Sequence, residues 1–265
     1  MHSYFFTTEG LYLILLQLKL ASIAIISNFL SAFAGGGAGL LQLPALILLG
    51  LPFPTALATH KLASVALGVG AGLRHYREKP LNQYLIAIIL CFGLPGVWIG
   101  ANIVLSIPNQ IATIALGSLT LFLGIYSAKK SSLGTASKRI PLNSKNTLLG
   151  GFPIFFIGIL NGSLTSGTGL FVTIWLVSFF KLSYTRAIGY TLILVGLFWN
   201  GTGALVLGLN GEIKWDWIPI LISGSLIGGY LGAHLSIKKG SYIVKRTFEI
   251  LTLIMGSSLI FKSLY

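Results

Sequence analysis

The sequence predicts an all-α protein: a polytopic transmembrane helix bundle of two inverted five-segment repeats with short broken helices. The mean hydropathy is +0.87 and only 9% of the residues are charged, which leaves more apolar surface than a soluble core of this size can hide. The apolar residues fall into ten segments separated by short polar stretches. Residue patterns recur after 130 to 132 positions, and this indicates an internal repeat.

The ten segments differ in length, and two of them are short for a helix that crosses a bilayer, so they either cross it or reach half its depth. A full helical span takes about 20 residues, whereas the second and seventh segments fall well below that length and each follows a glycine-rich stretch. The expected segments are 11–34, 38–51, 56–73, 83–105, 110–127, 146–161, 168–181, 186–208, 217–236 and 242–264. Because no Lys or Arg precedes the first one, we expect it to remain as a span rather than be cleaved after Ala34.

Matching residues in the two halves define the repeat. Gly39–Thr59 resembles Gly169–Thr191 in outline, and "GVWIGA" at Gly96–Ala101 corresponds to "GGYLGA" at Gly228–Ala233. We therefore expect a first transmembrane repeat over 1–128, a basic cytoplasmic linker over 129–145, and a second, inverted repeat over 146–265.

The distribution of Lys and Arg predicts the orientation. If every segment crosses, the basic loops around 74–79, 129–145, 181–186 and 238–246 lie on one face, and the positive-inside rule makes that face cytoplasmic with both termini outside. The basic loop of each half corresponds to a near-neutral loop of the other, as inverted repeats require. This placement also explains the net charge of +13 without nucleic acid, because the basic residues form no dense block.

The glycine breaks at Gly35–Gly39 and Asn161–Gly169 predict a binding site. Non-helical backbone at membrane depth is tolerated only inside protein or beside a water-filled cavity. The helix that follows each break begins with unpaired N–H groups and a partial positive charge, so two such ends brought together would hold an anion. Close helix packing is the competing explanation, which the "GVWIG" seam illustrates. The substrate-binding candidates are Gly36, Gly37, Gly39, Gln42, Thr59, His60, Lys61, Asn161, Thr165, Ser166, Thr168, Gly169, Arg186, Tyr190, Thr191 and Asn200.

Ionisable residues inside apolar segments are costly and are candidates for function. His60 and Lys61 open the third segment; they are either an interfacial pair that reaches water or part of an anion path, with Lys61 and Arg186 attracting the anion at the entrances. Asn200 either lines the site or bonds across a helix seam. Only five acidic residues occur in the chain, and this scarcity favours an anionic substrate over a cation.

The segment "SAFAGGGAGLLQLPALILLGLPFPTALAT" resembles the first-repeat signature of the TauE/SafE family of sulfite and sulfonate exporters, and "GSLTSGTGLFVTIWLVSFFKLSYTRAIGYT" resembles the second. The resemblance implies a multi-pass inner-membrane permease with inverted repeats that exports, or in some members takes up, sulfur oxyanions, sulfonates or related carboxylates. Two departures, His60-Lys61 after Ala-Thr and Ile-Gly-Tyr-Thr in the second copy, lie near the inferred site and bear on the substrate more than on the fold.

We therefore expect a secondary transporter, an exporter, of a small anion, sulfite or an organosulfonate first, that works by alternating access between the repeats. The alternatives are an anion-selective channel and a permease for small carboxylates or other sulfur compounds. The sequence shows no nucleophile and base arrangement typical of an enzyme, and we expect no cofactor and no bound metal. The expected partners are the anion and the lipid bilayer, not nucleic acid, and the sequence allows a homodimer.

Overall fold

The computed structural model describes residues 8–34, 38–76, 81–129, 144–165, 167–182, 184–238 and 241–264, and these residues form helices and no strand. In chain order the elements are α1 (Thr8–Ala34), η2 (Ala38–Leu40), α2 (Gln42–Leu48), α3 (Phe53–Tyr76), α4 (Gln83–Leu105), α5 (Asn109–Lys129), α6 (Ser144–Ser163), α7 (Thr168–Ser178), α8 (Tyr184–Tyr190), η3 (Thr191–Trp199), α9 (Asn200–Asn210), η4 (Trp215–Trp217), α10 (Ile218–Lys238) and α11 (Ser241–Leu264). The all-α fold is confirmed.

Helix lengths agree with the segments expected from hydropathy. Among the described residues, five stretches are long and apolar enough to cross a membrane: 10–33, 53–74, 83–105, 186–210 and 215–238. The second and seventh segments are short, as predicted, and end at Leu48 and Ser178. The third begins earlier than predicted, at Phe53, because a proline is tolerated in the first turn of a helix and Pro54 therefore does not prevent its start.

The eighth segment holds a feature that hydropathy did not predict. Elements α8, η3 and α9 follow one another without a gap, and η3 is a π-helix over Thr191–Trp199. Such wide turns are rare and frequently occur at functional sites. Here the π-helix lies where α3 crosses it at close range: a side chain at Gly68 would overlap the backbone of Gly196 and Leu197.

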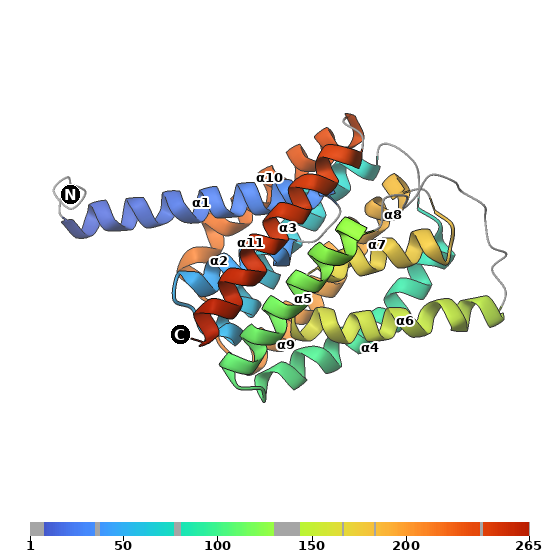
Figure 1. Cartoon of the computed structure of the whole chain (residues 1–265), viewed down its shortest axis with the longest axis horizontal. Coiled ribbons are helices and arrows are strands. Elements are labelled where there is room, and N and C mark those ends of the chain that lie inside the picture. Colours follow the sequence, from blue (N-terminus) through green and yellow to red (C-terminus); the bar gives the residue numbers. More distant parts are fainter. Residues whose placement is uncertain are drawn as a thin grey trace.

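The helices pack in pairs around α3 (Figure 1). Helix α1 lies along α10, α4 along α6, and α5 along α11, while α3 contacts α10, η3 and α9. Exchanging each segment with its counterpart in the other half converts the α1–α10 pair into the α6–α4 pair. The amino-terminal part of α1 extends beyond the bundle on the left of Figure 1.

Glycines at equivalent positions allow the backbones of the helices in each pair to come into contact. A side chain at Gly96 would overlap the Phe155 carbonyl oxygen, and one at its counterpart Gly228 would overlap that of Ile25. One turn further on, Gly100 meets Ile159 in the same way that Gly232 meets Phe29. The contacted residues are themselves 130 positions apart, so the repeat of the sequence is also a repeat of helix packing. The inverted orientation of the halves and the domain boundaries stay predictions.

Candidate functional site

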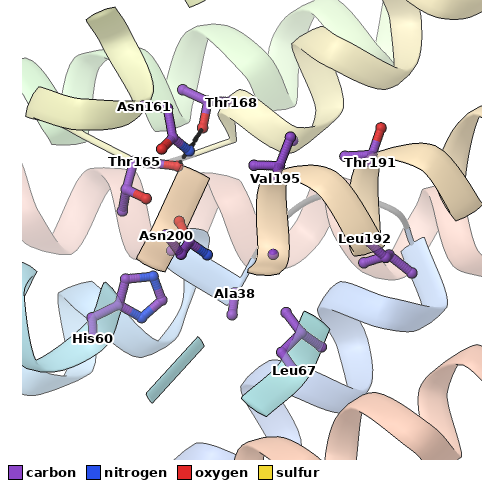
Figure 2. A pocket seen from close by; sticks show the side chains of 13 residues that line it. Ala38, His60, Leu67, Asn161, Thr165, Thr168, Thr191, Leu192, Val195 and Asn200 are labelled. Carbon is purple, nitrogen blue, oxygen red and sulfur yellow. Dashed lines mark hydrogen bonds between the residues drawn. The ribbon is translucent and has the colours of Figure 1, made fainter. Parts of the chain in front are cut away.

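The two glycine breaks meet in the interior of the bundle. A side chain at Gly39 would lie 2.6 Å from Thr165 Cγ2 and 3.2 Å from the Thr165 backbone. Beside this contact is a cavity that both breaks and the π-helix line (Figure 2). Its walls are Ala38, Gly39, His60, Leu67, Asn161, Thr165, Thr168, Gly169, Thr191, Leu192, Val195, Gly196 and Asn200.

The first residues of both short helical segments reach this cavity. Ala38 and Gly39 begin η2, and Thr168 and Gly169 begin α7. The cavity is small, about 20 Å³, which is room for roughly one water molecule. Any larger ligand therefore requires the surrounding helices to separate.

The second break is shorter than the sequence suggested. Helix α6 continues through Ser163, so Asn161 lies in its last turn rather than in the break. The chain then turns sharply, with positive φ at Thr165 (55°) and Gly167 (66°). A side-chain bond steadies the turn, since Thr168 Oγ1 donates to the Thr165 carbonyl at 2.8 Å. Glycine fits position 167 because it adopts this left-handed conformation without strain.

Lys61 lies beside the cavity and is wholly buried, with 0% of its surface exposed. Its ammonium donates to Asn161 Oδ1 at 3.0 Å, Thr165 Oγ1 at 3.3 Å and Asn200 Oδ1 at 3.5 Å. These partners are neutral oxygens, and all three residues line the cavity. The expectation of Lys61 at an entrance, or as an interfacial residue reaching water, is wrong: α3 begins at Phe53, which carries Lys61 two turns into the bundle.

Gly203 makes room for this lysine. A side chain there would lie 2.6 Å from Lys61 Cδ and 3.1 Å from its Nζ, so α9 offers the aliphatic stem a recess that only glycine provides. Asn161 also bonds to α7, because its Nδ2 donates to Thr168 Oγ1 at 2.8 Å. The ammonium is thus joined to the start of α7 through two side chains.

His60, the neighbour of Lys61 in the chain, is also buried, and its ring points toward the cavity in Figure 2. Its Nδ1 lies 3.1 Å from Gln42 Oε1. The Ser64 hydroxyl lies 3.3 Å from both ring nitrogens. Behind Gln42, the two N–H bonds of Asn28 Nδ2 have three acceptors within reach: the Ala24 carbonyl at 2.7 Å, Ser225 Oγ at 2.9 Å and Gln42 Oε1 at 3.2 Å.

The second half holds a counterpart to the contact between Gln42 and His60. Thr173 of α7 and Thr191 of the π-helix share a hydrogen bond of 2.9 Å between their hydroxyls. Both residues lie 131 positions after Gln42 and His60 respectively. The two short helices are therefore tied to the two crossing helices by equivalent bonds, with different side chains in each half.

The structure brings together ten of the thirteen predicted site residues that it describes. Gly39, His60, Asn161, Thr165, Thr168, Gly169, Thr191 and Asn200 line the cavity, and Lys61 and Gln42 bond to members of that group. Thr59 accepts a bond from the Lys214 N–H, Tyr190 accepts one from the Asn82 N–H, and Arg186 is half-buried; none of these three lines the cavity. Gly36, Gly37 and Ser166 lie outside the described residues.

Sequence reasoning missed Asn28, Ser225, Thr173 and Gly203. A signal existed for Asn28 and Thr173, since each is a polar residue inside an apolar segment. Gly203 carried no signal, because its role appears only when α3 and α9 are placed together. In the described part of the chain, no three His, Cys, Asp or Glu side chains lie close enough to hold a metal ion.

The described helices and the buried polar cavity between them define a multi-pass membrane protein, and its relatives are of that class. The chain belongs to the TauE/SafE family: the model of the family described as "Sulfite exporter TauE/SafE" matches residues 20–259. It is therefore a membrane transporter.

Among similar proteins, a "Probable membrane transporter protein" of Haemophilus influenzae is 27% identical over 239 residues, covering 90% of this chain and 92% of that one. The "Probable membrane transporter protein YfcA" of Escherichia coli K12 is 24% identical over 246 residues, 91% of this chain and 88% of that one. The "Probable membrane transporter protein YdhB" of Bacillus subtilis is 22% identical over 253 residues, covering 93% of this chain and 100% of that one.

Proposed function

We propose that this protein is a secondary transporter that exports a small anion, sulfite or an organosulfonate, across the cell inner membrane by alternating access between two inverted repeats. The observation that carries the proposal is the environment of Lys61. Its buried ammonium is bonded to three neutral oxygens beside a cavity where both glycine breaks meet.

Charge balance favours an anion at this position. A buried cation whose partners are neutral is costly in a low-dielectric interior, and an opposite charge relieves that cost. Among the described residues, no Asp or Glu lines the cavity; Glu212 and Asp216 are exposed, and Asp216 pairs with Lys214. The incoming substrate is therefore the group that neutralises Lys61.

The polar wall suits an oxyanion. Thr165 and Thr191 offer hydroxyl groups, and Gly169 places the start of α7, whose partial positive charge favours an anion, at the cavity wall. The apolar wall of Leu67, Leu192 and Val195 suits the carbon side of a sulfonate. Carboxylates of similar size share this chemistry and are the second substrate class to test.

The small cavity favours alternating access. Since it holds roughly one water, binding of sulfite requires the halves to separate along the seam between α3 and η3. A carrier that rocks one half against the other opens this seam to one side at a time. Export of a monovalent anion gains about 2.3 kcal/mol from a potential of 100 mV, so it needs no nucleotide.

Reconstitution in liposomes tests the proposal. The purified protein should take up labelled sulfite and methanesulfonate with saturable kinetics, whereas linear, non-saturating flux would favour an anion channel. Lys61→Gln should lower uptake roughly 100-fold or more, which corresponds to the loss of a buried charge partner. Lys19→Gln is the matched control: it removes the same charge from an exposed position on α1 and should leave uptake unchanged. Equal uptake by both variants would refute the role of Lys61.

A further inference from the structure

His60 and Lys61 are two basic groups side by side, and their surroundings are neutral. Lys61 is the charged neighbour of His60. The other residues that face the imidazole are Gln42 from α2, Ser64 from α3 and Asn200 from α9, while Asn28 of α1 and Ser225 of α10 stand behind Gln42. The backbone N–H of Lys214 donates to Thr59, the residue before His60. The side chains of Lys214 and Asp216 pair with each other and are exposed to water.

Hydrogen bonds favour Nε2 as the ring nitrogen of His60 that is free to bind a proton. The Ala24 carbonyl can only accept, so the Asn28 group facing it is the NH₂. That NH₂ also lies 3.2 Å from Gln42, and this contact is favourable when Gln42 presents its oxygen rather than a second NH₂ group. The same oxygen lies 3.1 Å from His60 Nδ1, and this arrangement favours the ring form that carries a proton on Nδ1. In that form the lone pair of the neutral ring is on Nε2.

The position of Nε2 allows both protonation states. The Ser64 hydroxyl lies 3.3 Å from it and can donate to the lone pair or accept from an N–H by rotating. The ring lines the cavity, so a proton that binds Nε2 adds its charge where an anion would lie. A second positive charge beside the Lys61 ammonium is unfavourable unless an anion offsets it.

We infer that His60 matches the charge of the site to the charge of the anion: it stays neutral beside a monovalent anion and binds a proton at Nε2 together with a divalent one. The inference rests on the proposed anion transport. With a monovalent anion, Lys61 alone makes the loaded site neutral. With a divalent anion, Lys61 and the protonated imidazole together do so. The proton is released to water from Nε2 when the anion leaves.

The inference makes proton movement depend on the valence of the anion. Proton binding and dianion binding favour each other by the same factor, as any two linked sites must. A divalent anion should therefore travel with one proton and a monovalent anion with none. One net negative charge crosses the membrane in both cases.

Sulfate and methanesulfonate are suitable probes, because both are small tetrahedral sulfur oxyanions whose charges, −2 and −1, do not change between pH 5.5 and 8. Any effect of pH on their uptake therefore belongs to the protein. In liposomes that contain the wild-type protein and an internal pH dye, we expect sulfate entry to carry about one proton per anion and methanesulfonate entry to carry none. The ratio of sulfate to methanesulfonate uptake should rise at least about fivefold from pH 8 to 5.5, the lower end of typical coupling between sites.

Two variants assign the effect to His60. His60→Asn keeps an N–H donor near Gln42, and His60→Gln places an amide near the position of Nε2; neither can titrate. In each, the ratio of sulfate to methanesulfonate uptake should fall at least about fivefold at pH 5.5 and should no longer depend on pH. The matched control is His234→Asn, the same change at a histidine that accepts a bond from Arg74 at the end of α10, where the ratio should keep its pH dependence.

The outcomes separate the two proposals. If the wild-type protein moves neither sulfite nor methanesulfonate, the proposed function fails. If it moves methanesulfonate but rejects sulfate at every pH, or moves sulfate without a proton, the function stands and the inference about His60 is wrong. A His60 variant that still carries one proton per sulfate also overturns it.

Discussion

The two halves of the molecule share a frame and differ in chemistry. Glycine contacts hold α4 against α6 as they hold α10 against α1, and each short helix is tied to a crossing helix by an equivalent bond. The first half supplies Gln42, His60 and Lys61, whereas the second supplies hydroxyls and amides, with Thr173 and Thr191 in the equivalent places. The comparison teaches that the repeat builds the cavity, while departures from the repeat determine its charge.

Lys61 connects the two halves, because it belongs to the first and bonds to the second. Its acceptors Asn161, Thr165 and Asn200 all lie beyond the linker. The residue at the equivalent position in the second half is Leu192, which lines the apolar side of the cavity. One cation therefore serves a site that two similar halves enclose, and this suits a ligand with a single excess charge.

The largest expected effect breaks the shared frame. Gly100→Leu and Gly232→Leu should each abolish recovery of folded, monodisperse protein in detergent, because either side chain meets helix backbone that cannot move aside. Equal losses at both positions would support equivalent seams, as judged by size-exclusion chromatography and thermal unfolding. Wild-type-like stability of either variant would show that the close contact there is unimportant.

A second prediction concerns a variant in which the first half carries the same side chains as the second half at the paired positions. The double variant Gln42→Thr/His60→Thr copies the Thr173 and Thr191 pair into the first half. Because the equivalent bond is replaced rather than removed, the protein should fold, and its ratio of sulfate to methanesulfonate uptake at pH 5.5 should fall at least about fivefold. An unchanged ratio would mean that the charge of the site does not depend on the difference between the halves.

A third prediction concerns the recess for Lys61. Gly203→Ala places a methyl group 2.6 Å from the Cδ atom of the lysine stem and should raise the KM for methanesulfonate about fivefold, since the stem must move aside at a cost of about 1 kcal/mol. Gly201→Ala is the matched control on α9, where the nearest atom to an added Cβ is Val65 Cγ2 at 3.9 Å. If both variants have the same KM, the fit around the lysine stem does not affect anion binding.

The smallest expected effect concerns the hydrogen bond between Thr173 and Thr191 in the second half. Thr173→Val and Thr191→Val should each lower the free energy of unfolding by about 1 kcal/mol, because each leaves one buried hydroxyl without its partner. The double variant should cost less than the sum of the two. Strictly additive losses in thermal or denaturant unfolding would mean that the two hydroxyls are not coupled.

Much of this arrangement could be predicted from the sequence. Hydropathy and glycine spacing predicted all ten segments, the two short ones among them, and the constant offset identified Gly96 and Gly228 as counterparts before their contacts were known. The depth of Lys61 could not be predicted this way. A lysine near the end of an apolar segment usually reaches water, and only the earlier start of α3 and the recess at Gly203 reveal that this one does not.

The π-helix and the Asn28 network were also beyond the sequence. A π-helix over Thr191–Trp199 depends on how α3 crosses at Gly68, which is a property of packing and not of local residue preference. Asn28 gains its role from Ser225, 197 positions away. In both cases a contact between distant segments, rather than any local pattern, determines the structure.

The π-helix over Thr191–Trp199 ends directly before Asn200, the first residue of α9. The number of residues per turn in the π-helix therefore determines which way Asn200 faces. If that stretch tightens by a single residue, everything after it rotates by about 100°. Such a rotation carries the Asn200 oxygen away from the lysine ammonium and turns Gly203 with it. A single rotation of α9 would then both open the contact with α3 and break the bond between Asn200 and the Lys61 ammonium.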